Sequence, residues 1–218
     1  MKFYTRTLPG MLNIAVFGSG RGSNFHAILD AIKSDKIPHT RIACIISNNS
    51  AAGILELAHE NSLPAYHLSQ KQFGSEEEFV NRMLALLRMN DVNFIALAGY
   101  MKLLPSRIIA EYRGRIVNIH PALLPKFGGR GMYGSRVHEA VLAAGETYSG
   151  ATVHLVDEVF DHGAILLQKA VPVLANDSPE SLAARVLQIE HEIYPEAIRQ
   201  FALGRWGIPA DTATAAHP

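Results

Sequence analysis

The first half of the chain alternates short apolar runs with segments of helical periodicity. Near-continuous apolar residues at 93–98 are typical of a strand that is covered on both faces. Further strands are expected at residues 13–17, 41–47 and, more weakly, 64–68, with helices at 24–33 and 52–61. Strands that alternate with helices predict βαβ units and an α/β fold, with a mostly parallel twisted sheet and helices on both faces.

The clearest helical pattern follows Ser75. This serine can cap the helix, and Glu78 three residues later completes the signature of a capping box. Apolar residues then recur on one face, as expected for a helix packed against a core: Phe79, Val80, Met83, Leu84, Leu86 and Leu87.

The second half of the chain changes character. A strand is expected at 115–119, a helix around 138–144, and an antiparallel strand pair at 151–156 and 165–173. A long helix should begin at Ser178-Pro179, because proline suits the first helical turn. Its core-facing residues are Leu182, Val186, Ile189 and Ile193, and Pro195 is expected to end or kink it.

No repeat, low-complexity segment or linker divides the chain. The economical prediction is one domain over residues 11–206, preceded by an N-terminal extension at 1–10 and followed by a flexible C-terminal tail at 207–218.

Composition narrows the classes of function. The 218 residues carry 20 basic and 20 acidic side chains, and this zero net charge argues against a nucleic-acid partner. No apolar stretch approaches the roughly 20 residues of a membrane-spanning helix, and the first ten residues lack a signal-peptide core. The single cysteine, Cys44, allows no internal disulfide, which fits a reducing compartment. These features predict a cytoplasmic protein without a nucleic-acid partner.

Ligands of open α/β sheets bind beyond the carboxyl ends of the strands. A Gly- and Ser-rich segment, residues 18–24, lies at such a place, directly before a predicted helix. Its glycines and the helix amides favour an anion. Ser23 replaces the third glycine of a dinucleotide motif, and residues 47–49 lack the acidic residue that would hold a ribose. A phosphomonoester site is therefore preferred, with an ordinary βα turn as the alternative.

Asn118 and His120 close the strand at 115–119. Period-two alternation places both side chains on one side, where two donors could stabilise an oxyanion. The loop at 157–163 supplies carboxylates, one of which could raise the pKa of His120 and accept a proton. Asp161 is favoured, although Asp157 and Glu158 stay open at this stage.

The remaining candidate chemistries are weaker. The histidines, including His138 and His154, form no helical pair or tight cluster, so no metal site is expected, and His154 is read as a support for the site. Cys44 lies in an apolar strand and no G-x-S-x-G motif is present, so a covalent nucleophile is not expected.

Together, five segments resemble one family. From residue 13 to about 206, the chain resembles the phosphoribosylglycinamide formyltransferases, folate-dependent enzymes of purine synthesis with a Rossmann-like formyltransferase fold. The matching segments are residues 20–24, 97–104, 118–125, 157–163 and 188–191. Their order and spacing together are specific, although each segment alone is modest.

The resemblance implies two small-molecule substrates. The formyl donor would be 10-formyltetrahydrofolate, and the acceptor would be the glycinamide amine of 5'-phosphoribosylglycinamide. Gly22, Ser23 and Asn24 would hold the acceptor's phosphate, and Glu190 would contact its glycinamide part.

The resemblance also implies the folate site and the catalytic groups. The pterin pocket would be lined by Met101, Lys102, Leu103 and Leu104, with Asn118 nearby. Asn118 and His120 would stabilise the tetrahedral intermediate, with His120 as proton donor. Asp161 would keep His120 protonated and help to carry the proton lost by the amine.

Bacterial members can carry an arginine near the folate tail, where this chain has only Glu76, Glu77 and Glu78 as charged residues.

Three alternatives share this catalytic constellation or its fold. Methionyl-tRNA formyltransferases usually add a C-terminal domain and need a basic face, and formyltetrahydrofolate deformylases usually add an N-terminal domain. A silent nucleotide- or folate-binding module is the third. The phosphate-type segment and the joint presence of Asn118, His120 and Asp161 favour the nucleotide acceptor.

Overall fold

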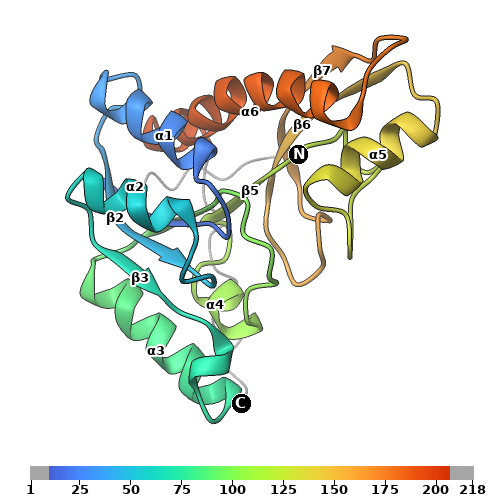
Figure 1. The fold of residues 1–218 in the computed structure, drawn as a ribbon. Coiled ribbons are helices and arrows are strands. Elements are labelled where there is room, and N and C mark those ends of the chain that lie inside the picture. Colours follow the sequence, from blue (N-terminus) through green and yellow to red (C-terminus); the bar gives the residue numbers. More distant parts are fainter. Residues whose placement is uncertain (1–9, 207–218) are drawn as a thin grey trace, which may run out of the picture.

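The computed structural model of the chain describes residues 10–206. The expected extension at 1–10 and tail at 207–218 lie outside these residues, apart from Gly10. The described chain forms a seven-stranded sheet of order β3-β2-β1-β4-β5-β6-β7, with helices against both faces (Figure 1).

The strands and helices follow the alternation expected from the sequence. The strands are β1 (Leu12–Phe17), β2 (Thr40–Ser47), β3 (Ala65–His67), β4 (Phe94–Leu97), β5 (Ile116–His120), β6 (Tyr148–Leu155) and β7 (Ile165–Pro172). The helices are α1 (Ser23–Lys33), α2 (Gly53–Glu60), the 3-10 turn η1 (Gln70–Gln72), α3 (Glu76–Met89), α4 (Ser106–Glu111), α5 (Ser135–Ala143) and α6 (Pro179–Ala202).

The pairing of the strands confirms the predicted mostly parallel sheet. Strands β3, β2, β1, β4 and β5 pair in parallel, whereas β6 pairs antiparallel with both β5 and β7. Strand β1 lies between β2 and β4, so the chain order reverses direction there. This reversal is the topological switch point at which open α/β sheets bind ligands.

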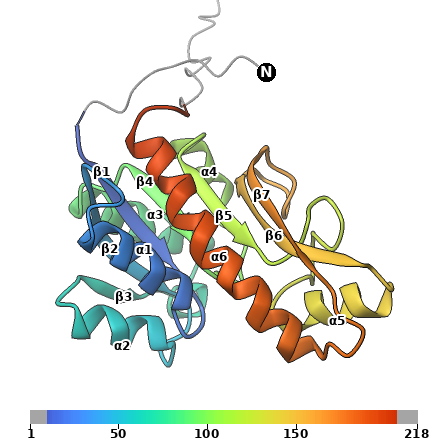
Figure 2. The ribbon, with the colours of Figure 1, turned by 90° about the horizontal axis from the view of Figure 1, so that it is seen from above.

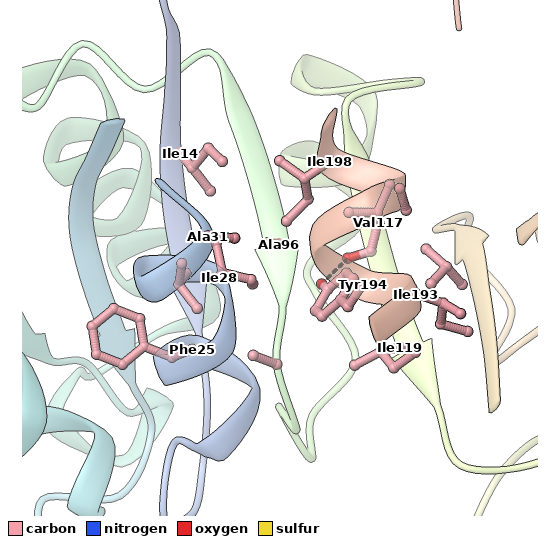
Figure 3. Packing of buried hydrophobic residues seen from close by; sticks show 14 of the residues in the cluster. Ile14, Phe25, Ile28, Ala31, Ala96, Val117, Ile119, Ile193, Tyr194 and Ile198 are labelled. Atoms are coloured by element: carbon pink, nitrogen blue, oxygen red, sulfur yellow. Dashed lines mark hydrogen bonds between the residues drawn. The ribbon is translucent and has the colours of Figure 1, made fainter. Parts of the chain in front are cut away.

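Two apolar clusters cover the two faces of the sheet. Helices α1, α2, α5 and α6 contribute to one cluster, and α3 and α4 contribute to the other. Figure 2 shows α6 crossing the sheet between α1 and α5. The hydroxyl of Tyr194 on α6 lies 2.9 Å from the carbonyl oxygen of Leu97 and 3.2 Å from that of Val117, so α6 contacts β4 and β5 directly (Figure 3).

The start of α3 confirms the predicted cap and corrects its second half. The Ser75 hydroxyl accepts a hydrogen bond from the backbone N–H of Glu78 at 3.2 Å. The Glu78 carboxylate accepts from the N–H of Gly74, at 3.0 Å, rather than from that of Ser75. All six predicted apolar residues of this helix are buried.

Helix α6 begins after Ser178 as predicted, but it does not end at Pro195. It continues to Ala202 because the last two turns bury Ala197, Ile198 and Phe201 in the core. That burial offsets the cost of about 3 kcal/mol for a proline inside a helix.

Two helices differ from the sequence prediction. Helix α5 begins at Ser135, three residues before the predicted start, and the short helix α4 was not predicted. Within residues 10–206, no helix combines the length and apolarity needed to cross a membrane.

Candidate active site

A cavity of about 1490 Å³ opens at the carboxyl ends of β1, β4 and β5. Its walls come from the segments that follow these strands, from the loops before α5 and after β6, and from one face of α6. All the site residues expected from the sequence line it: Gly22, Ser23, Asn24, Met101, Lys102, Leu103, Leu104, Asn118, His120, Asp161 and Glu190. The fold thus gathers these residues around one cavity.

The turn between β1 and α1 is built around Gly22. This residue precedes α1 with a φ of 85°, and no side chain caps the helix. A Cβ atom at Gly22 would lie 3.0 Å from the Cα of Ile54, so both the conformation and the space favour glycine. The uncapped N-terminal N–H groups of α1 therefore lie at the cavity wall, where they can donate hydrogen bonds to an anion.

Asn24 and Glu190 form a buried polar pair at the cavity wall. The Asn24 side-chain amide donates to the Glu190 carboxylate at 2.6 Å. Burial raises the pKa of Glu190, and the bond from Asn24 partly opposes this. The Asn24 amide is thus engaged by Glu190. We therefore expect Asn24 to reach a phosphate through its backbone N–H rather than through its side chain.

The segment after β4 is tied to the turn after β1 through Ser19. The Ser19 hydroxyl accepts from the N–H of Met101 at 2.9 Å, and its own N–H donates to Gly99 at 3.0 Å. Met101 and Leu103 are 49% and 43% exposed, which makes them available to an apolar ring. Leu104 is 2% exposed and belongs to the core. Leu104 therefore lines the cavity as a fixed part of the core rather than as an exposed side chain.

Asn118, His120 and Asp161 meet at the end of β5, together with His154 from β6. The Asp161 carboxylate lies 3.4 Å from His120 Nδ1 and 3.5 Å from His154 Nε2. Asn118 Nδ2 lies 3.4 Å from Asp161 Oδ1 and 3.0 Å from His154 Nε2. An amide donor, an imidazole and a carboxylate around one point can stabilise an oxyanion and move a proton.

The structure separates the three carboxylates that the sequence left open. Asp157 lies 3.1 Å from the exposed His162, and Glu158 lies 3.4 Å from Arg113 on the surface. Asp161, with a side chain only 10% exposed, is the one within reach of His120.

Burial sets the direction of the pKa shift of His120. It lowers the pKa of this imidazole, and the raising effects of Asp161 and of the Phe127 carbonyl are smaller. Burial opposes the charged form of Asp161 as well, but hydrogen bonds from His154 and Gly129 and the nearby His120 lower its pKa. Asp161 thus raises the pKa of His120 as expected from the sequence, but burial outweighs it, so the net shift is downward.

Three features of the site were not identified from the sequence. The Phe127 carbonyl oxygen lies 2.8 Å from His120 Nε2, and a backbone group leaves no residue signature. Ser19 stood inside the Gly-rich segment but was not singled out. His138 is buried in the cavity wall, with its Nδ1 unbonded among the described residues. Within residues 10–206, no group of three or more His, Cys, Asp or Glu side chains is arranged to hold a metal ion.

The chain is similar to known proteins over most of its length. A family model described as formyl transferase matches residues 12–198. The phosphoribosylglycinamide formyltransferase of Haemophilus influenzae is 40% identical over 195 residues, which cover 89% of each chain. The crystal structure of glycinamide ribonucleotide transformylase 1 from Symbiobacterium toebii superposes with a TM-score of 0.83 at 40% identity, again over 89% of each chain.

Plant relatives are longer. The chloroplastic phosphoribosylglycinamide formyltransferase of Vigna unguiculata is 44% identical over 185 residues, which cover 85% of this chain and 59% of that protein. The chain thus spans about three fifths of the length of the plant relatives that it matches. The match over residues 12–198, the shared Rossmann-like fold and the relatives that align over most of both chains lead to one conclusion. The chain belongs to the formyl transferase family, and within it to the phosphoribosylglycinamide formyltransferases.

Proposed function

We propose that the protein transfers the formyl group of 10-formyltetrahydrofolate to the glycinamide amine of 5'-phosphoribosylglycinamide. The products are formylglycinamide ribonucleotide and tetrahydrofolate. The observation that carries this proposal is the meeting of Asn118, His120 and Asp161 in a cavity with an anion-type turn on one wall and a half-exposed apolar segment on another.

The two substrates bind at different walls of the cavity. The phosphate of the ribonucleotide binds at the amides of Gly22, Ser23 and Asn24, at the positive end of the α1 dipole. Glu190 receives the glycinamide part. The pterin ring of the folate lies against Met101 to Leu104, and this segment offers apolar side chains together with backbone groups.

The reaction needs no covalent bond to the enzyme. The glycinamide nitrogen attacks the formyl carbon, and the carbonyl oxygen becomes an oxyanion that Asn118 and protonated His120 stabilise. The intermediate collapses as the bond between the carbon and N10 of the folate breaks. The amine loses one proton and N10 gains one, so Asp161 and His120 need only carry a proton across the site.

The test is a spectrophotometric assay for the folate product from a 10-formyl folate analogue, with and without the ribonucleotide. Turnover that requires the ribonucleotide supports the proposal. Turnover without it would identify a deformylase, and no turnover in either assay would point to a different acceptor, such as a tRNA, or to a binding module.

Variants then test the residues. Asn118→Ala and His120→Ala should bind the folate but lose about 100-fold or more in kcat, since each removes one donor or proton carrier. His162→Ala is the matched control because His162 lies in the Asp161 loop but is 72% exposed. Full activity in either test variant would overturn the mechanism.

We further propose one domain over residues 11–206, small molecules as its partners, and a cytoplasmic location. The neutral net charge argues against a nucleic-acid partner, and the lone buried Cys44 needs no oxidising compartment. The plant relatives carry chloroplastic names, so fractionation of the native cell is the test of location.

A further inference from the structure

The two ring nitrogens of His120 face groups of different character. Nε2 lies 2.8 Å from the carbonyl oxygen of Phe127, whereas Nδ1 lies 3.4 Å from the Asp161 carboxylate. A backbone carbonyl can only accept, so the short contact requires the hydrogen on Nε2. In the neutral ring the other nitrogen, Nδ1, then carries the lone pair.

The segment that presents this carbonyl is constrained at each of its three residues. Phe127 has a φ of 56°, a conformation that non-glycine residues seldom adopt, and its half-buried ring packs against the main apolar cluster. A Cβ atom at Gly128 would lie 2.5 Å from Leu124 Cδ2 and 3.2 Å from the Cβ of Asp161. The N–H of Gly129 donates to Asp161 Oδ2 at 2.9 Å. One short segment therefore fixes both neighbours of His120.

From this geometry we infer that His120 gains and loses its catalytic proton at Nδ1. The hydrogen on Nε2 stays bonded to the Phe127 carbonyl oxygen and takes no part in the reaction. The exchange of a proton at Nδ1 during catalysis rests on the proposed function, whereas the position of the hydrogen on Nε2 does not. Phe127 is thus a positioning residue that acts through its backbone.

The charges around Nδ1 support this assignment. Asp161 lies against Nδ1, and Asn118 Nδ2 lies 3.4 Å from the other oxygen of the same carboxylate. A proton placed between Nδ1 and Asp161 is held by both groups, whereas the Phe127 carbonyl can only keep the Nε2 hydrogen in place. The proton lost by the attacking amine can therefore pass to the Asp161–Nδ1 pair and then to N10. The bonds and charges balance without any hydrogen leaving Nε2.

The tautomer can be measured without any substrate. The ¹⁵N spectrum of the full chain with labelled histidine, assigned for His120 by its loss in His120→Asn, should show the neutral ring with hydrogen on Nε2. A wild-type ring with its hydrogen on Nδ1 would overturn the inference. Because this readout needs no turnover, it stands or falls independently of the formyltransfer reaction.

A pair of glycine variants tests the positioning role. Gly128→Ala should displace the carbonyl, mix the two tautomers, and lower kcat about tenfold while the KM of both substrates changes less than about twofold. Gly131→Ala is a stringent control, since its φ of 91° adds a backbone strain that Gly128→Ala lacks, but its Cβ would meet nothing within 4 Å. It should keep both the tautomer and kcat.

A second variant covers a failure of Gly128→Ala to fold. Phe127→Gly introduces no clash and frees the φ angle, so it should loosen the carbonyl and mix the tautomers with a smaller loss of kcat. Mixed tautomers together with wild-type kcat, in either variant, would overturn the positioning role.

Discussion

The carboxylate of Glu190 and the side-chain amide of Asn24 are joined by a buried hydrogen bond of 2.6 Å across 166 positions of sequence. It links α6 to the first turn of α1, beside the cavity. One turn further along α6, the hydroxyl of Tyr194 reaches the carbonyls of Leu97 and Val117. Consecutive turns of α6 thus hold the ends of the segments that form the site.

The first prediction concerns Glu190. Glu190→Ala should raise the KM for the ribonucleotide about tenfold, a loss of about 1.4 kcal/mol in binding. Because it leaves the Asn24 amide buried without an acceptor, it should also lower the free energy of unfolding by about 1–3 kcal/mol. Steady-state kinetics and urea unfolding measure the two effects.

The matched control is Glu192→Ala, two residues later on the same helix. Glu192 is exposed and pairs with Lys169 at 2.6 Å on the surface, so its removal should change stability by at most about 1 kcal/mol and leave KM unchanged. A Glu190→Ala enzyme with wild-type KM would restrict this residue to a structural role.

The second prediction contrasts two glycines of one turn. Gly22→Ala must strain a φ of 85° and crowd Ile54 at 3.0 Å, so it should cost about 1–3 kcal/mol in stability and raise the KM for the ribonucleotide more than about tenfold. Gly20→Ala adds a Cβ that meets nothing within 4 Å and should be close to wild type. Equal KM values for the two variants would contradict a phosphate site at this turn.

Periodic features of the sequence were sufficient for most of the fold. Apolar runs marked the strands, and Ser75 and Ser178 marked helix starts, because each of these signals depends on neighbours close in the chain. The helix α4 was missed since it has six residues and no side-chain cap. Pro195 was expected to end or kink helix α6, and the helix does not end there because long-range packing outweighs a local preference.

The candidate site was predictable in composition but not in energetics. Asn118 and His120 could be paired by strand alternation, whereas Asp161 could be chosen over Asp157 and Glu158 only when a three-dimensional fold separated them. The pKa of His120 was expected to rise because a carboxylate was foreseen and the depth of burial was not. Burial is the sum of many distant contacts, and no local pattern reports it.

The third prediction concerns the pH dependence of the rate. Burial, opposed by Asp161 and by the Phe127 carbonyl, lowers the pKa of His120, and His154 adds to the lowering. The protonated form should therefore be lost, and kcat should fall, as pH rises through a value below the ordinary histidine range. Asp161→Asn removes the group that raises this pKa, so the alkaline limb of the pH–rate profile should move to lower pH. An unmoved limb would mean that another group sets the protonation of His120.

The fourth prediction concerns stability at acid pH. Burial lowers the pKa of three imidazoles, those of His120, His138 and His191. Each binds a proton more readily in the unfolded chain, where the pKa is about 6.5. The stabilisation is therefore fully present above that pH and is lost as pH falls below it toward the folded values. Asp161 has a lowered carboxyl pKa, so its own contribution is lost only in a more acidic range.

Urea unfolding at about pH 7.5 and about pH 5.5 tests this prediction, with a lower free energy of unfolding expected at the acid pH. His138→Gln should flatten the dependence, because it removes a buried imidazole whose Nδ1 is unbonded among the described residues. The same change at His162, whose side chain is 72% exposed, is the control for the substitution at an unburied site. If both variants kept the wild-type slope, the loss of stability in acid would have to arise from His120, His191 or the carboxylates.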